Sequence, residues 1–200
     1  MMDLFSTEKT IFNLPQAELI YFPQFYTQME ASSFFHTLME QTLWQQDQIT
    51  LFGKTHKQPR LTALYAETNR PYSYSGITMT PHPFNDILLK IKQDVEAISK
   101  HTFNSVLLNL YRDGNDSNGW HADNEKELGS NPVIASVSFG ATRNFKFKHR
   151  TLKQENHKLE LKHGSLLLMK GEMQKYWLHQ IPKTLKPTEK RINLTFRYIA

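Results

Sequence analysis

The sequence predicts an α+β protein in which a mixed N-terminal part packs onto a C-terminal β-fold, either a sandwich, a barrel or a jelly roll. Two stretches before residue 104 repeat apolar side chains at helical spacing, and after it the chain changes to short β-rich segments separated by turn residues. The 200 residues suffice for one well-buried domain and are too few for two comfortable ones. We therefore expect a single domain over 1–200, with an N-terminal extension over 1–103 and a β core over 104–200.

Two helices are expected in the extension. Thr27 and Glu30 have the spacing of a capping box, so the first helix should begin after Thr27. Its apolar positions are Phe34, Phe35, Leu38, Met39 and Leu43. The second helix follows Pro83, and its apolar positions are Phe84, Ile87, Leu88, Ile91, Val95 and Ile98. Between the helices, Ile49–Lys54 has the pattern of a short strand entering a glycine turn, which predicts a hairpin.

The C-terminal half is expected to consist of short strands. They are Asn104–Tyr111, Ile134–Phe139, Asn144–Lys148, Lys158–Lys162, Ser165–Met169, Tyr176–Ile181 and Arg191–Ile199. Many short strands that follow one another between turn residues are typical of a sandwich, barrel or jelly roll.

Composition narrows the class of protein. Hydrophobic residues make up 39% and charged residues 22%, which is ordinary for a globular chain. There is no cysteine, so disulfides, thiolate metal sites and cysteine nucleophiles are excluded, and a bound metal must use His, Asp or Glu. The net charge of +5 favours a polyanionic partner. We find neither a signal peptide nor an apolar run of membrane-spanning length, and we expect a cytoplasmic protein that does not enter a membrane.

One His-x-Asp pair stands out among the nine histidines: His121 and Asp123. Side chains two residues apart on a strand share a face, so an imidazole nitrogen and a carboxylate oxygen would point at the same spot. By itself such a pair is more often a surface pair or a turn than a metal site. His179, on a separate strand-like segment, is the best candidate for a third ligand. Two histidines and one carboxylate leave open coordination positions, as non-haem Fe(II) oxygenases need. On spacing alone, three other histidines would serve equally well: His149, His157 and His163.

The last expected strand alternates strictly between polar and apolar residues. Its apolar face holds Ile192, Leu194, Phe196 and Tyr198, and the opposite face holds Arg191, Asn193, Thr195 and Arg197. Such a face would be unremarkable in solvent. If it lines the interior of the β-fold, two buried arginines need anionic partners, and a dicarboxylate such as 2-oxoglutarate fits, because guanidinium binds carboxylate bidentately. Asn109 and Tyr111, also two residues apart, add an amide and a phenol.

Taken together, these motifs resemble the AlkB family of nucleic-acid dealkylases, and especially its branch that repairs double-stranded DNA. The resemblance runs from about Phe52 to the C-terminus, roughly three quarters of the chain. It implies a double-stranded β-helix, a cupin-like jelly roll, preceded by a nucleotide-recognition extension. It implies Fe(II) held by His121, Asp123 and His179. It also implies 2-oxoglutarate held by Asn109, Tyr111, Arg191, Thr195 and Arg197, with Asn193 nearby. Arg191 is expected at the distal carboxylate and Arg197 at the end nearer iron, although the two roles are exchangeable.

The same resemblance assigns the contacts with the substrate. Phe52–Gly53–Lys54 matches a finger hairpin whose aromatic side chain fills the gap left by a flipped base, although composition alone favours Phe52 as a core residue. Glu125, after the metal-binding Asp, would favour a cationic methylated base, whereas Asn124 stands where relatives often have an acidic residue. The other expected substrate residues are Arg60, Tyr72, Ser73, Tyr74 and Arg143. Basic residues near Arg143 would follow a phosphate backbone or simply form a solvated hairpin: Lys146, Lys148, His149, Arg150 and Lys153.

The implied reaction is oxidative demethylation of 1-methyladenine and 3-methylcytosine with Fe(II), 2-oxoglutarate and O2, releasing succinate, CO2 and formaldehyde. The implied partner of the expected monomer is alkylated DNA, in duplex form, with RNA less favoured. Three alternatives remain open. One is an RNA or protein demethylase on the same fold, and another is a module that binds damaged DNA or a dicarboxylate without turnover. The third, a zinc hydrolase using the same His-Asp-His set, is disfavoured by the paired arginines of the last strand.

Overall fold

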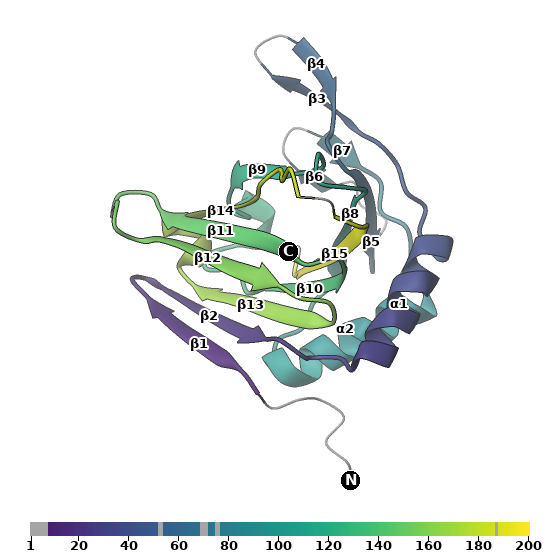
Figure 1. Cartoon of the computed structure of the whole chain (residues 1–200), viewed down its shortest axis with the longest axis horizontal. Coiled ribbons are helices and arrows are strands. Elements are labelled where there is room, and N and C mark those ends of the chain that lie inside the picture. The colour runs from purple at the N-terminus through teal and green to yellow at the C-terminus, as the bar shows by residue number, and fades with distance from the viewer. Residues whose placement is uncertain (1–7, 52–53, 69–71, 75–76, 187) are drawn as a thin grey trace.

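Two antiparallel β-sheets that face each other form the centre of the computed structural model (Figure 1), which describes residues 8–51, 54–68, 72–74, 77–186 and 188–200. The larger sheet contains β1 (Thr10–Leu14), β2 (Ala17–Phe22), β5 (Leu61–Ala66), β8 (Ser105–Tyr111), β10 (Ile134–Gly140), β13 (Ser165–Gly171) and β15 (Arg191–Arg197). The smaller sheet contains β9 (Asn118–His121), β11 (Arg143–His149), β12 (Asn156–Leu161) and β14 (Trp177–Ile181). The strand orders are β1-β2-β13-β10-β15-β8-β5 and β12-β11-β14-β9.

The larger sheet includes strands from both halves of the sequence. All seven strands expected after residue 104 are present, with ends that shift by one or two residues, and Tyr176 belongs to a short helix instead. β1, β2 and β5 were not expected, yet they extend this sheet at both of its edges. The sheet therefore continues across the expected division at residue 103.

Both expected helices are present. α1 (Gln28–Gln41) begins after the predicted capping box: Thr27 N donates to Glu30 Oε2 at 3.0 Å, and Glu30 N donates to Thr27 Oγ1 at 3.3 Å. The helix ends before Leu43, which is exposed rather than part of the apolar face, so that assignment was wrong. α2 (Asp86–Ser99) is capped by Asn85, whose Oδ1 accepts from Leu88 N at 3.0 Å. The remaining helical turns are short: η1 (Lys126–Leu128) and α3 (Met173–Tyr176).

Side chains on the two faces of the larger sheet point into different surroundings, a hydrophobic core on one face and a cavity on the other. On β15, Ile192, Leu194 and Phe196 join one hydrophobic cluster with the apolar faces of α1 and α2, so the helices cover the outer face of the larger sheet (Figure 1). A second cluster fills part of the space between the two sheets with side chains from both, such as Phe147 and Leu167. The polar residues of β15 therefore face the interior, where the rest of that space forms a cavity.

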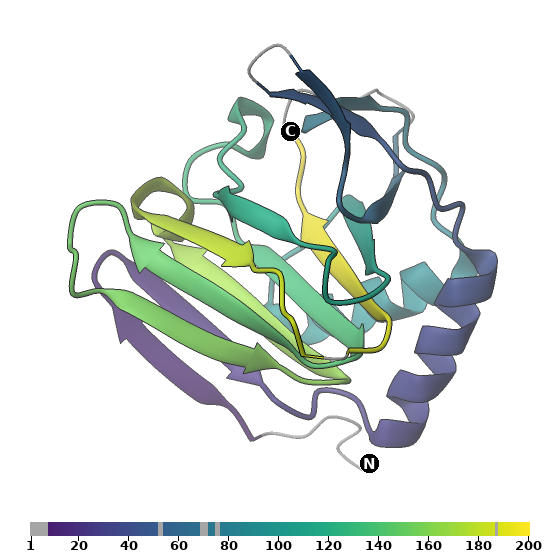
Figure 2. The same cartoon turned by 45° about the horizontal axis from the view of Figure 1, so that its top comes forward.

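Two small hairpins lie over one end of the sheets (Figures 1 and 2). They are β3 (Gln48–Leu51) with β4 (Lys54–Lys57), and β6 (Tyr72–Tyr74) with β7 (Ile77–Met79). The predicted finger hairpin is thus present as two paired strands, and Lys54 begins its second strand. The expected finger residues Phe52 and Gly53 lie outside the described residues. Across the described ranges, the structure contains no helix with the length and apolar character needed to span a bilayer.

Candidate active site

Three potential metal ligands converge at the end of the cavity nearest β9. One ligand atom from each of His121, Asp123 and His179 lies within 4.8 Å of the others. His121 ends β9 and pairs directly with His179 on β14, which brings their ring centroids to 4.3 Å. Asp123 lies two residues beyond the end of β9, in irregular backbone rather than in the strand expected for the His-x-Asp pair. The convergence expected from the sequence is therefore present, although the strand ends before the carboxylate.

The hydrogen bonds of His121 suit a metal ligand. Gly119 O lies 2.7 Å from His121 Nδ1, which favours the tautomer that carries its proton on Nδ1 and donates it to this carbonyl. Nε2 then keeps its lone pair, which accepts from Asn118 Nδ2 at 3.2 Å and would exchange this hydrogen bond for a metal. Metal-binding histidines commonly donate their other N–H to a carbonyl or carboxylate in this way.

His179 is a buried, neutral imidazole. Burial lowers its pKa to about 3, and the nearby positive charge of Arg197 acts in the same direction. Among the described residues, nothing accepts or donates a hydrogen bond at its buried Nδ1. An unprotonated imidazole next to a carboxylate is what a divalent metal requires of a His ligand.

Asp123 is held from two sides. Its backbone N–H donates to Gln174 Oε1 at 2.9 Å, and its Oδ1 accepts from Arg197 Nη2 at 2.8 Å. Burial alone would raise the pKa of Asp123, but the positive charge of Arg197 and the neighbouring imidazoles hold it below its ordinary value. The carboxylate is therefore ionised and oriented before any metal arrives. Gln174, on α3, was not predicted, and no sequence pattern marks it as a neighbour of Asp123.

The polar face of β15 lines the cavity, as the alternation predicted. Asn193 Nδ2 donates to Ser136 Oγ at 2.8 Å, and its Oδ1 accepts from Thr195 Oγ1 at 3.0 Å. Arg197 lies at the metal end through its contact with Asp123. The cavity lining contains every predicted metal and cosubstrate residue: Asn109, Tyr111, His121, Asp123, His179, Arg191, Asn193, Thr195 and Arg197.

Arg191 provides the clearest sign that an anion belongs in this cavity. Arg191 is 1% exposed, and its guanidinium donates from Nη2 to Ser138 Oγ at 3.0 Å and lies 5.1 Å from the centroid of the Tyr111 ring. Within the described residues, its Nε and Nη1 have no hydrogen-bond partner. Burial lowers its pKa to about 10, so it stays protonated at neutral pH. A buried cation with free donors fits a carboxylate ligand, so the residues present suit 2-oxoglutarate.

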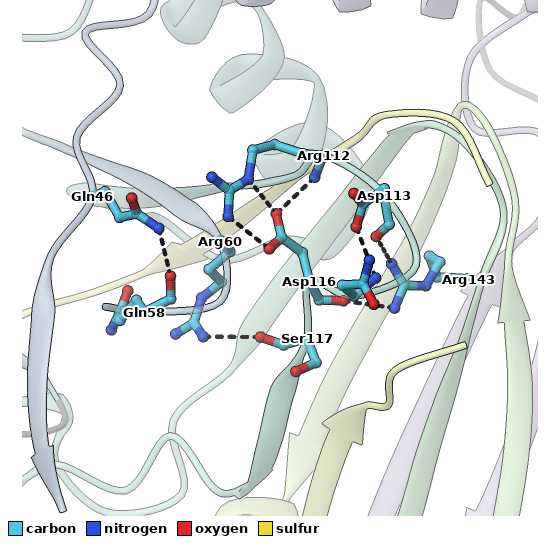
Figure 3. Close-up of polar contacts among 9 residues, drawn as sticks. Gln46, Gln58, Arg60, Arg112, Asp113, Asp116, Ser117 and Arg143 are labelled. Carbon is cyan, nitrogen blue, oxygen red and sulfur yellow. Dashed lines mark hydrogen bonds and ion pairs between the residues drawn. The ribbon is translucent and has the colours of Figure 1, made fainter. Parts of the chain in front are cut away.

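The position of Arg143 does not fit the expected contact with substrate. Arg143 is 4% exposed, and its guanidinium donates to the carbonyls of Asp113 and Asp116 at 3.1 and 2.8 Å (Figure 3). It also donates to the carbonyl of Pro182 at 2.7 Å. These bonds tie the β8–β9 loop to the segment after β14. Because its donors are directed at backbone inside the protein, Arg143 holds loops together instead of following a phosphate backbone.

A second arginine stabilises the same loop from within. Arg112 donates from Nε and Nη2 to Asp116 at 2.7 and 2.8 Å, and its backbone N–H donates to the same carboxylate at 2.9 Å (Figure 3). Burial would raise the pKa of Asp116, but these bonds with Arg112 hold it below its ordinary value.

We expect Asp116→Asn to lower the free energy of unfolding by about 1–3 kcal/mol at pH 7, since it removes charge-assisted hydrogen bonds. The folded-state pKa lies below the unfolded value, so this stabilisation is complete above the unfolded pKa and is lost as pH falls through the folded one. Urea unfolding of both proteins at pH 7 and pH 3 measures the difference. If the difference in free energy of unfolding between the two proteins were as large at pH 3 as at pH 7, or larger, this role for the carboxylate would be contradicted.

Glu125 and Asn124 follow the metal-binding Asp but differ in environment. Burial raises the pKa of Glu125, and within the described part of the chain its buried Oε2 has no hydrogen-bond partner. Asn124 is exposed. Glu125 is therefore the better placed of the two for a cationic base. The backbone of Tyr72, Ser73 and Tyr74 forms β6.

The alternative histidines have other partners. His149 Nε2 lies 3.1 Å from Gln16 Oε1, and His157 Nε2 lies 2.8 Å from Glu155 Oε2. His163 Nδ1 accepts from Gly140 N at 2.8 Å. Over the residues that the structure describes, His179 alone joins His121 and Asp123.

Comparison with known proteins agrees with this geometry. A family model described as "2OG-Fe(II) oxygenase superfamily" matches residues 18–197. The chain is 44% identical over 186 residues to "Alpha-ketoglutarate-dependent dioxygenase alkB homolog 3" of Bos taurus, covering 88% of this chain and 64% of that protein. It is 36% identical over 210 residues to "DNA oxidative demethylase ALKBH2" of Arabidopsis thaliana, covering 92% and 67%. The chain thus spans about two thirds of the length of these curated relatives.

A solved structure shares the fold. "The structure of OsALKBH1" superposes with a TM-score of 0.66 at 16% identity, covering 94% of this chain and 100% of that chain. At this identity the likeness concerns the fold alone. Together with the family match, it confirms the expected double-stranded β-helix.

Proposed function

The chain belongs to the AlkB family within the 2OG-Fe(II) oxygenase superfamily, and we propose that it is a dioxygenase that oxidatively removes alkyl groups from nucleic-acid bases. The cofactor of this superfamily is Fe(II), with 2-oxoglutarate and O2 as cosubstrates. The observation that carries the proposal is the His121–Asp123–His179 cluster beside a buried guanidinium with free donors. Neither a bare DNA-binding module nor a hydrolase needs both features.

The residues of this chain would divide the work as follows. His121, Asp123 and His179 would hold Fe(II). With 2-oxoglutarate and O2, the bound metal would supply the chemistry for hydroxylation of a methyl group on the base, with succinate, CO2 and formaldehyde as products. Arg191 binds the distal carboxylate of 2-oxoglutarate. Arg197 keeps the Asp123 carboxylate ionised and oriented. Apolar side chains in the cavity lining, such as Phe145, Leu161 and Met169, would limit the water near the reacting groups.

Base recognition is proposed for the end of the cavity below the two hairpins. The finger hairpin β3–β4 and the segment Tyr72–Tyr74 lie over this end of the protein (Figure 2). Glu125 lies close enough to Asp123 and Arg197 for their charges to affect its pKa, and its carboxylate favours a cationic base such as 1-methyladenine or 3-methylcytosine. A finger hairpin that fills the gap left by a flipped base favours duplex DNA over RNA. The described ligand set is complete within one chain, so the proposed monomer needs no second subunit to form the metal site.

The nucleic-acid backbone is proposed to follow the outer face of the smaller sheet. Lys146 on β11 lies directly opposite Lys158 on β12, an arrangement that is unfavourable without a counter-charge. Lys148 lies on the same face, with Nζ 4.4 Å from the ring centroid of Trp120, which is 38% exposed. Within the described residues, none of the three lysines forms an ion pair. A phosphate backbone would supply the missing charge.

We expect the double variant Lys146→Gln, Lys148→Gln to bind duplex DNA more weakly and with a shallower dependence on salt. Each lysine that no longer neutralises a phosphate should reduce the slope of log K against log salt by about 0.9. Fluorescence anisotropy with labelled DNA from 50 to 200 mM salt, roughly the range over which such charges matter, measures this slope. Lys100→Gln, at the end of α2 on the far side of the larger sheet, is the control and should leave the slope unchanged. Equal slopes for all three proteins would place the backbone elsewhere.

The reaction itself is tested with oligonucleotides that carry one 3-methylcytosine, offered as duplex DNA, single-stranded DNA and RNA. The protein is loaded with Fe(II) without O2, and O2 and 2-oxoglutarate are then added. Mass spectrometry follows the loss of the methyl group, and succinate is measured in parallel. We expect demethylation fastest on duplex DNA. If succinate formed without demethylation, the protein would still be a dioxygenase, but with another substrate. Faster turnover of the RNA oligonucleotide would make RNA the substrate class. If iron were bound and neither succinate nor the demethylated oligonucleotide formed, the proposal would be overturned.

A further inference from the structure

Asn109 presents a defined amide to the cavity. It lies on β8, is buried, and lines the cavity together with Arg191 and Thr195. Its Oδ1 accepts from Arg60 Nε at 2.7 Å, a short charge-assisted hydrogen bond. Among the described residues, nothing accepts a hydrogen bond from its Nδ2. The oxygen of the amide is thus engaged, whereas its donor remains available.

Arg60 is itself held in place. It lies immediately before β5, at the base of the β3–β4 hairpin, and is 5% exposed. The Arg60 Nη1 donates to Ser117 O at 3.2 Å (Figure 3). In return, Ser117 N donates at 2.9 Å to the carbonyl of Pro59, the residue before Arg60. The guanidinium therefore bridges the β8–β9 loop and Asn109. Such burial differs from the direct contact with substrate that the sequence suggested for Arg60.

We propose that Arg60 is a positioning residue for the cosubstrate: it fixes the orientation of the Asn109 amide so that Nδ2 donates to a carboxylate in the cavity. The two ends of an amide differ only in hydrogen bonding, so an Asn without a fixed partner adopts either orientation. With the opposite orientation, Asn109 would present an oxygen to a carboxylate, and the two would repel each other. A guanidinium can only donate, so Arg60 selects the orientation that binds an anion. This inference rests on the proposed use of 2-oxoglutarate and not on the identity of the nucleic acid.

The test is a double-mutant cycle on cosubstrate affinity without turnover. The dissociation constant for 2-oxoglutarate is measured by calorimetry on the full chain loaded with Mn(II), without O2 or nucleic acid. Arg60→Met should weaken 2-oxoglutarate binding roughly tenfold, the effect of losing one charge-assisted hydrogen bond. In the Asn109→Ala background, the same change at Arg60 should have an effect of less than about twofold, because the amide through which it acts is gone.

The controls separate positioning from general damage. Arg112→Met breaks an arginine contact to the same loop that does not involve Asn109, and it should leave the affinity for 2-oxoglutarate unchanged. Arg60→Lys keeps a donor and should restore most of the affinity that Arg60→Met removes. Thermal unfolding of each variant checks that the protein is folded at the temperature of the titration.

Two outcomes overturn the proposal. Arg60→Met with unchanged affinity would mean that the orientation of Asn109 does not depend on it. An equal loss of affinity with and without Asn109 would assign Arg60 a direct or purely structural role. Because no nucleic acid is present, failure of the proposed demethylation would leave this result intact, whereas absence of 2-oxoglutarate binding in the unaltered protein would count against the proposed function and this inference together.

Discussion

Asp123→Asn should eliminate metal-dependent activity and weaken metal binding by at least roughly tenfold to a hundredfold. The substitution keeps the size of the side chain and the backbone bond to Gln174, so the change is one of charge. A neutral amide is a poor ligand for a divalent cation, and the remaining pair, His121 and His179, is insufficient for tight binding. Titration with Mn(II), followed by electron paramagnetic resonance, measures the affinity, and succinate formation measures turnover.

The same variant should also be less stable than the unaltered protein in the absence of metal. Asp123 is the carboxylate that Arg197 contacts at 2.8 Å in a buried site. Removing one charge of a buried pair typically lowers stability by about 3–5 kcal/mol. Asp116→Asn is the matched control, since it makes the same change at a buried aspartate of another ion pair. It should lose stability and keep its metal affinity, and if both variants bound Mn(II) as well as the unaltered protein does, Asp123 would not be a ligand.

Local patterns in the sequence predicted most of the site. The ligand pair His121 and Asp123 and the alternation of β15 are both visible in residues two apart. Strand geometry fixes which side the β15 residues face, whereas Asp123 reaches the site from irregular backbone beyond β9. The capping box at Thr27 is equally local. Ser136 and Ser138, which accept hydrogen bonds from the polar face of β15, were missed. Their own alternation on β10 was a signal that could have found them.

Contacts between distant segments could not be predicted in this way. The hydrogen bond from Asp123 to Gln174 joins residues 51 positions apart, and only the folded chain brings them together. Arg143 was misassigned for a related reason. A basic residue beside other basic residues suggests a phosphate contact, but its carbonyl partners come from two distant loops that no pattern near Arg143 reveals. β5 was missed because a continuously buried strand lacks the alternation that marks a half-exposed one.

Arg191→Met should weaken 2-oxoglutarate binding roughly a hundredfold or more and at the same time stabilise the protein that has no cosubstrate. The buried guanidinium has two nitrogen atoms, Nε and Nη1, without partners among the described residues. This charge is costly in the ligand-free protein and favourable once a carboxylate is present. Methionine has a similar length and no charge, so it removes the cost together with the binding site. Calorimetry measures affinity, and urea unfolding with and without 2-oxoglutarate measures stability.

The opposite signs of the two effects distinguish a binding residue from a structural one. Arg143→Met is the matched control, because Arg143 is also buried but its guanidinium donates to three backbone carbonyls. Its loss should destabilise the protein with little effect on the affinity for 2-oxoglutarate, since those carbonyls lose their donors. We expect Arg191→Met to raise the free energy of unfolding without ligand by about 1–3 kcal/mol, within the range seen when buried charges are replaced by apolar groups. If it instead destabilised the protein as Arg143→Met does, and bound 2-oxoglutarate normally, Arg191 would be a structural residue and the anion would bind elsewhere in the cavity. If Arg191→Met both stabilises the ligand-free protein and abolishes 2-oxoglutarate binding, the cavity retains an unfavourable positive charge because cosubstrate binding requires it.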